Sequence, residues 1–142
     1  MSDPKMTDGI KLSLMMPESR VRLEHFIAAR NLRYPRAFPY HLAMPHAIVV
    51  EVLDVRAKPL RDSSASKLRL TAKLRVSVRA LATRYIDDPG RERKLSPHSS
   101  PIEFNMDILI EAIATPNGDE LYEIQPETAT LLTWWTGATP EK

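Results

Sequence analysis

The chain contains 142 residues, of which 43% are hydrophobic and 27% are charged. This length and composition are those of a single globular domain with a core, and they exclude a disordered chain. The 20 basic and 18 acidic residues leave a formal net charge of only +2. The absence of cysteine excludes disulfides, thiolate catalysis and thiolate zinc sites.

The beginning of the chain carries no targeting or membrane signal. Residues 1–20 hold no apolar stretch of signal-peptide length, and no apolar run in the chain reaches the roughly 18 residues of a membrane span. We therefore expect a cytoplasmic protein with no membrane partner. Residues 1–16 are treated as an N-terminal arm, in which Ile10, Leu12 and Leu14 alternate with polar residues as in a short edge strand.

Residues 17–33 form the only helix that the sequence predicts. Pro17 suits the first helical position, Glu18 suits the positive end of the helix dipole, and Pro35 ends the segment. Residues 34–46 contain three prolines and are predicted to be an extended crossing segment.

Residues 47–58 are rich in β-branched side chains and predict a strand. The start of this strand is apolar on both faces, which is typical of a central strand. Residues 59–66 carry Pro, Asp and Ser and predict a turn that leads into the next strand.

Residues 67–83 carry the most regular pattern of the chain. Apolar side chains take every even position from Leu68 to Ala82, and basic or hydroxyl side chains take the odd positions from Arg69 to Arg79. Because successive side chains on a strand point to opposite faces, this alternation predicts a half-buried strand with one apolar and one basic face.

The next segment, residues 84–101, is dense in charge, proline and glycine and is predicted to be a long loop. Residues 102–114 then mirror residues 67–83. Their apolar side chains alternate with polar ones that include Glu103 and Asp107. This pattern predicts a second long strand, with one apolar and one acidic face.

The Asn117-Gly118 pair that follows is the strongest short hairpin signal. Residues 121–135 are therefore predicted to return antiparallel, before a polar tail over residues 137–142. One helix followed by four or five strands predicts a mainly β (α+β) single domain over residues 17–136. Its antiparallel sheet, with long hairpin strands, is expected to close into a barrel or sandwich, with the N-terminal helix packed outside.

The predicted strands are long for so small a chain. A strand over residues 67–83 spans about 50 Å, whereas a compact domain of this length is about 37 Å across. Either bulges fold the strands over, or the hairpin projects beyond the core and leaves an apolar face that needs a partner. The second arrangement predicts an oligomer.

The basic face of residues 67–83 has three interpretations. If this strand pairs with the next one, its cations lie beside Glu103, Asp107 and Glu111, and the resulting ladder of ion pairs helps to set the register. The second interpretation is a nucleic-acid groove. The third is an electrostatic interface between subunits.

Candidate catalytic and metal-binding residues are sparse. The 4 histidines have no metal-ligand spacing. The carboxylates Asp87, Asp88 and Glu92 lie among basic residues, which is typical of a solvated loop. The scattered glycines do not form a phosphate-binding loop. We therefore expect no catalytic residue, no metal site and no cofactor.

Two sets of residues are candidates for contact with a partner. Adjacent tryptophans in a strand put one ring on each face, where a ring either caps the core or anchors an interface. The interface candidates are Trp134, Trp135, Leu68, Leu70, Ile102 and Phe104. The candidates for contact with nucleic acid or an acidic partner are Arg30, Arg33, Arg36, Arg69, Lys73, Arg75 and Arg79.

The functional prediction rests on strand length and on the lack of a catalytic motif. We expect a non-enzymatic structural subunit that forms a homo-oligomeric ring, tube or shell with neighbouring assembly proteins. A phage or virion tail, neck or capsid component fits this description and would be located in the virion. The alternative is a nucleic-acid-binding β-barrel that uses the basic strand face. A ligand pocket or enzyme in a curved sheet is the third hypothesis.

Overall fold

The computed structural model describes residues 4–30, 40–60, 67–86, 94–118 and 121–136. Within them, two helices precede four strands: α1 (Pro4–Met15), α2 (Pro17–Ala29), β1 (Tyr40–Pro59), β2 (Leu68–Ile86), β3 (Lys94–Pro116) and β4 (Tyr122–Trp135). The mainly β class predicted from the sequence is confirmed, but the described residues contain two helices in place of the one predicted.

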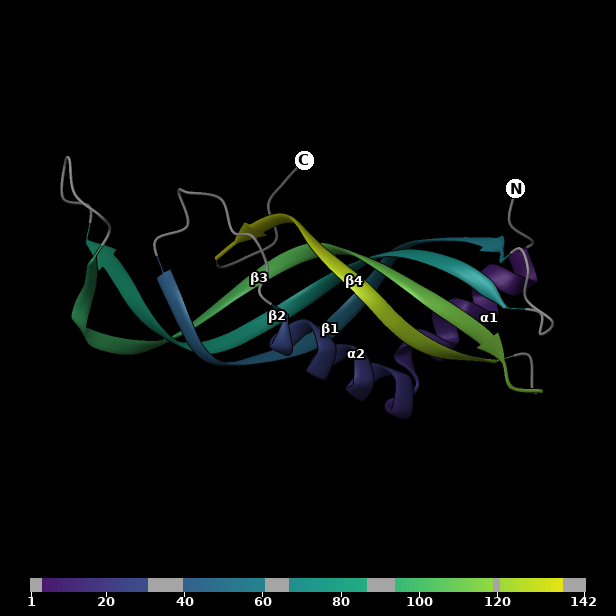
Figure 1. Cartoon of the computed structure of the whole chain (residues 1–142), viewed down its shortest axis with the longest axis horizontal. Coiled ribbons are helices and arrows are strands. Elements are labelled where there is room, and N and C mark those ends of the chain that lie inside the picture. The colour runs from purple at the N-terminus through teal and green to yellow at the C-terminus, as the bar shows by residue number, and fades with distance from the viewer. Residues whose placement is uncertain (1–3, 31–39, 61–66, 87–93, 119–120, 137–142) are drawn as a thin grey trace.

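The four strands form one antiparallel sheet in the order β1-β2-β3-β4. In the described residues this sheet is open, because β1 pairs only with β2 and β4 pairs only with β3. The expected closure into a barrel or sandwich is not found. Figure 1 shows a long, strongly twisted sheet with both helices on one side. The helices contact β1 and β4, so they bridge the outer strands across the face that a second sheet would otherwise cover.

The core lies between the helices and the apolar face of the sheet. On β2, every even-numbered side chain from Leu68 to Ala82 is buried, whereas the odd-numbered ones are half-buried or exposed. This confirms the alternation predicted for the strand. The helices add four buried aliphatic side chains, Ile10, Leu14, Leu23 and Ile27. Full burial of one such side chain is worth about 1.5–3 kcal/mol, so the apolar face holds the two layers together.

Helix α1 lies where the sequence analysis expected an arm or an edge strand. Its buried side chains Ile10 and Leu14 are four residues apart, which is one helical turn, while Leu12 between them is 57% exposed. The apparent alternation in this segment was therefore part of a helical pattern. No helix in the described part of the chain has the length and apolar character needed to cross a membrane.

Strand β1 is an outer strand and not the central strand that its composition suggested. Ala47 and Val49 are buried, but the intervening Ile48 and Val50 are 42% and 53% exposed. The apolar character of both faces at the start of this strand therefore does not reflect burial on both faces. Strand β1 also begins earlier than predicted, because Tyr40 already pairs with Arg84 of β2.

Side chains of the helices occupy part of each outer edge of the sheet. On the β1 edge, the Val49 backbone N–H donates to Oε2 of Glu24 on α2 at 2.8 Å. On the β4 edge, the Tyr122 N–H donates to Oγ of Ser13 on α1 at 2.9 Å, and this hydroxyl donates in turn to the Gly9 carbonyl at 2.7 Å. Backbone groups of an outer strand, which would otherwise stay open to another chain, are satisfied internally at these points.

The turn between β3 and β4 is the one predicted from the Asn-Gly pair. The Asn117 N–H donates to the Leu121 carbonyl at 3.1 Å, and Gly118 has φ of 101°. This left-handed conformation favours glycine because a Cβ atom would be strained there. Helix α2 ends at Ala29, with Arg30 as its extended C-cap, and so stops short of the predicted end at residue 33. Residues 31–33 and the polar tail at residues 137–142 lie outside the described residues.

The predicted loop over residues 84–101 is largely strand. Strand β2 continues to Ile86 and β3 begins at Lys94, and residues 87–93 lie outside the described part. Pairing continues through Tyr85 opposite Leu95, with a register shift after Thr83. We call residues 80–86 of β2 and 94–102 of β3 the projecting hairpin, because they extend past the helices and past the end of β4 (Figure 1).

Candidate interaction surfaces

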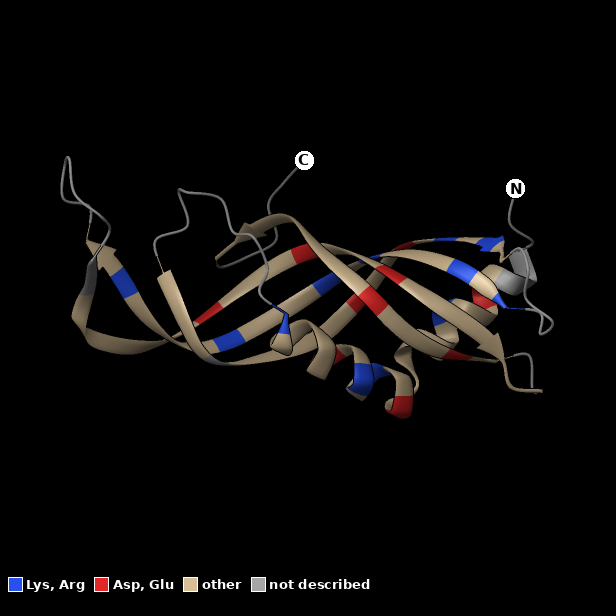
Figure 2. Cartoon of the chain, viewed as in Figure 1, with Lys and Arg blue, Asp and Glu red and all other residues tan. Residues whose placement is uncertain are grey.

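The face of the sheet opposite the helices, which we call the outer face, carries charges of both signs (Figure 2). Two of the odd-numbered cations of β2 lie opposite carboxylates of β3, whereas the third predicted carboxylate, Glu111, lies opposite Thr71. Arg79 pairs in register with Glu103, and Arg75 pairs in register with Asp107. The ladder of cross-strand ion pairs predicted from the sequence is therefore present at these two positions.

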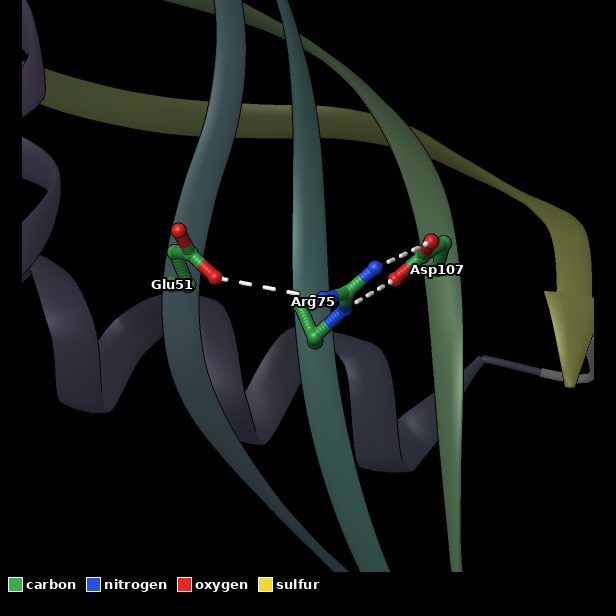
Figure 3. A network of polar contacts seen from close by, with 3 residues as sticks. All are labelled: Glu51, Arg75 and Asp107. Carbon is green, nitrogen blue, oxygen red and sulfur yellow. Dashed lines mark hydrogen bonds and ion pairs between the residues drawn. The ribbon is translucent and has the colours of Figure 1, made fainter. Parts of the chain in front are cut away.

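Arg75 is the centre of a network on the outer face (Figure 3). Its Nε and Nη2 atoms donate to the two carboxylate oxygens of Asp107 at 3.0 and 3.2 Å, and its Nη1 atom lies 4.0 Å from Glu51 Oε2. The Asp107 side chain is only 8% exposed. The hydrogen bonds to Asp107, aided by the charges of Asp107 and Glu51 and opposed by burial, raise the pKa of Arg75. Arg75 is thus a fixed cation whose charge is matched within the chain.

The two tryptophans at the end of β4 lie on opposite faces of the sheet, as expected. Trp134 is opposite Met106 and packs edge-on against Phe104 of the core, with ring centroids 6.4 Å apart. Trp135 lies under the guanidinium of Arg75, 5.0 Å from its carbon. Each ring is therefore packed against its own chain, and Trp135 strengthens the position of Arg75 by a cation–π contact.

Among the remaining cations of the nucleic-acid candidate set, those on β2 share the outer face with Arg75, whereas Arg30 lies in the helical layer. Arg69 lies 3.9 Å from Glu127 and Arg79 lies 3.5 Å from Glu103. Lys73 stands in register with Asp54 of β1. Arg30 is at the end of α2, in the helical layer, where its guanidinium lies 5.0 Å from the centre of the Phe26 ring. Arg33 and Arg36 lie outside the described residues.

Half of the interface candidates belong to the core of the single chain. Leu68, Leu70 and Phe104 are at most 8% exposed, because the helices cover the apolar face on which these residues lie. Ile102 and Trp134 are only partly buried. Leu68, Leu70 and Phe104 therefore do not offer a surface to a partner in this fold.

A small cavity of about 180 Å³ lies where the projecting hairpin leaves the core. Its walls include Tyr40, Ile102, Phe104 and Trp134, so three of the six interface candidates meet there. Strand β4 ends at Trp135, opposite Asn105, and this end leaves the cavity uncovered on one side. Tyr40 was not among the interface candidates, because the proline-rich segment around it gave no strand signal.

The projecting hairpin has further apolar side chains at its surface. Ile86 is 49% exposed, and the ring of Tyr85 packs edge-on against His41 of β1, with ring centroids 6.4 Å apart. No group of three or more His, Asp or Glu side chains suited to a metal ion occurs in the described residues. The hairpin is therefore a mixed polar and apolar surface.

No family model, no curated protein and no solved structure matches this chain. Function is consequently argued from the geometry described above.

Proposed function

We propose that the chain is a non-enzymatic structural subunit that assembles with copies of itself and with neighbouring proteins into a ring, tube or shell. The tail, neck or capsid of a phage or virion is such a particle. The observation that carries this proposal is the projecting hairpin, which extends past the helices and past the end of β4 (Figure 1).

A projecting hairpin has little to hold it in an isolated subunit. Two paired strands alone are marginally stable in water, and a stable sheet needs further strands or a packed layer. Here β1 pairs with β2 as far as Arg84, so the hairpin has a third strand on that side, whereas β4 pairs with β3 only as far as Asn105 and the helices do not reach the hairpin (Figure 1). A neighbouring subunit would supply the missing layer.

The surface of the hairpin is suited to such a contact. Ile86 exposes a large apolar side chain, and the cavity beside Ile102 and Trp134 offers a place for an apolar side chain of a neighbour. Partly buried aromatic rings of this kind are frequent anchors of protein interfaces. The charges of the outer face, by contrast, are matched within the chain at Arg75 and Arg79.

The test is the mass of the protein in solution, measured by light scattering and sedimentation over a range of concentrations. We expect a mass several times the 16.1 kDa of one chain. Ile86→Ser should lower this mass, whereas Val21→Ser should not, because Val21 has the same exposed fraction of 49% but lies on α2. A wild-type mass of one chain at high concentration would contradict the proposal.

Nucleic-acid binding by the basic face of β2 is the weaker alternative. Its cations Arg69, Arg75 and Arg79 each lie within 4.0 Å of a carboxylate, so a phosphate backbone would have to displace internal ion pairs. Binding of this kind weakens steeply with salt. A gel shift with single- and double-stranded nucleic acid at low and high salt measures it, and we expect no salt-sensitive complex.

A further inference from the structure

The cavity at the base of the projecting hairpin has the size of a single side chain. Its volume is about 180 Å³, which is smaller than the roughly 300–1,000 Å³ of small-molecule sites. It is close to the roughly 150 Å³ of an apolar cavity that holds one benzene-sized group. Ile102, Phe104 and Trp134 line it, and apolar walls disfavour a polar occupant. The cavity therefore fits one apolar side chain.

The far end of the same hairpin presents such a side chain. Ile86 is the last residue of β2 and is 49% exposed. It cannot fill the cavity of its own chain, because the strand from Ala80, which pairs with Ile102 at the cavity, to Ile86 spans about 20 Å. Ile86 of a second copy has no such restriction.

The charges near the hairpin tip and near the cavity are complementary. Arg84 is exposed at an even position of β2, as Ile86 is, and it has no ion-pair partner among the described residues. Glu103 lines the cavity, and its side chain is 58% exposed although it lies 3.5 Å from Arg79. A carboxylate has acceptor sites for more than one cation. The tip thus carries an unmatched cation, and the cavity carries an accessible carboxylate.

We propose that the hairpin tip of one copy docks at the cavity of the next copy, with Ile86 inserted into the cavity and Arg84 paired with Glu103. Such docking presupposes the proposed function and defines the two surfaces that meet in the assembly. Because these surfaces differ, each added copy leaves one tip and one cavity free. The contact is therefore head-to-tail, and growth continues until a ring closes or a filament forms.

Sedimentation of full-length variants altered at the tip or at the cavity tests this contact. Ile86→Asp puts a charge at the tip, and Thr136→Trp puts a large ring at the cavity that Thr136 lines. Each variant alone should have the mass of one chain. Both positions are exposed, so both variants are expected to fold, which thermal unfolding checks. An equimolar mixture of the two should give particles of two chains and no larger, because one intact tip then meets one intact cavity.

Charge reversal tests the ion pair and does not depend on filling the cavity. Arg84→Glu and Glu103→Arg should each weaken association about two- to fivefold, as expected for an exposed pair. Both changes in one chain should restore most of the association, because the reversed charges attract across the contact. The matched control is Arg56→Glu on β1, where the side chain is 82% exposed. This variant should associate as the wild type does.

The proposed function and the docking contact can fail separately. A wild-type mass of one chain would contradict both. A wild-type mass of several chains that neither Ile86→Asp nor Thr136→Trp lowers would overturn the docking contact alone. A wild-type mass of two chains, which a reciprocal pair would give, would overturn the head-to-tail order. A mixture of the two variants that stays at the mass of one chain would also overturn the contact.

Discussion

Strands β2 and β3 run through two regions of the molecule, which differ in how many neighbouring strands and helices pack against them. Where the helices cover them, both strands have a partner on each side, and their apolar side chains are buried. In the projecting hairpin, the described part of β3 has a partner only on the side of β2, because β4 has ended, and the helices lie elsewhere (Figure 1). The support that neighbouring elements give to β2 and β3 therefore changes along the two strands.

Under the proposed function, the two regions have different roles: the covered region provides the stability of the fold, and the projecting hairpin provides the contact with other subunits. The covered region holds nearly all of the buried apolar side chains, and its outer edges are partly satisfied by Glu24 and Ser13. We infer that this region folds as a unit and that the projecting hairpin contributes little to the free energy of unfolding. Substitutions should therefore have large effects on stability in one region and on assembly in the other.

The largest expected effect is that of Leu74→Ala at the middle of β2. Leu74 is 0% exposed, and removing such a side chain leaves a cavity that costs about 2–5 kcal/mol of unfolding free energy. Ile86→Ala in the projecting hairpin should cost at most about 0.5 kcal/mol, because Ile86 is 49% exposed. Urea unfolding of both variants measures the difference. Similar losses in the two variants would show that the hairpin is part of the cooperative core.

A smaller effect is expected for the ion pairs of the outer face. Asp107→Ala should cost about 1.5–3 kcal/mol, because it removes two hydrogen bonds to a charged group at a site that is 8% exposed. Glu103→Ala should cost at most about 1 kcal/mol, because the Arg79–Glu103 pair is largely exposed. Urea unfolding at neutral pH compares the two. If Glu103→Ala lowers the unfolding free energy as much as Asp107→Ala does, the burial and the two hydrogen bonds of the Arg75–Asp107 pair do not make it the stronger of the two pairs.

The raised pKa of Arg75 fixes the sign of its pH dependence. A group whose pKa is higher in the folded state contributes stability below its unfolded pKa and loses it as the pH rises through the folded pKa. For an arginine this loss lies far above neutral pH. The charge of Arg75 should therefore add no pH dependence to the unfolding free energy between pH 5 and about pH 9.

The central part of the fold could be predicted from the sequence because its alternation of apolar and polar residues is regular. The alternation on β2 predicted the buried face, and the carboxylates Glu103 and Asp107 indicated which strand lies beside it. The Asn117-Gly118 pair predicted the β3–β4 turn. Each of these signals follows from the local geometry of a strand or a turn alone.

Other elements depend on tertiary contacts that the sequence does not encode locally. Ile10 and Leu14 fit both a helix and a strand, and their position against the sheet decides for the helix. The exposure of Ile48 on β1 depends on which strands flank it. The start of α2 and the β3–β4 turn, about a hundred residues apart, line the same cleft, and no sequence motif indicated this.

The positions of the prolines carry structural information that was interpreted as a loop signal. Strand β2 contains no proline, and neither does the part of β3 that pairs on both sides, from Asn105 to Ala114. Pro97 and Pro101 lie in the part of β3 beyond the end of β4, and they made this segment resemble a loop. Because proline has no N–H to donate, it is tolerated in a strand where its backbone faces an open edge.

The smallest expected effect on stability, at most about 0.5 kcal/mol, is that of replacing both Pro97 and Pro101 by Thr. The substitution adds two N–H donors, and we expect those donors to face the open edge of β3, where unpaired donors template pairing with another chain. Light scattering should show particles larger than the wild-type assembly. The control is Ser96→Thr with Ser100→Thr, which raises strand propensity without adding an N–H. If the control associates as strongly as the proline variant, the prolines do not protect this edge, and the difference between the two regions lies in side-chain packing alone.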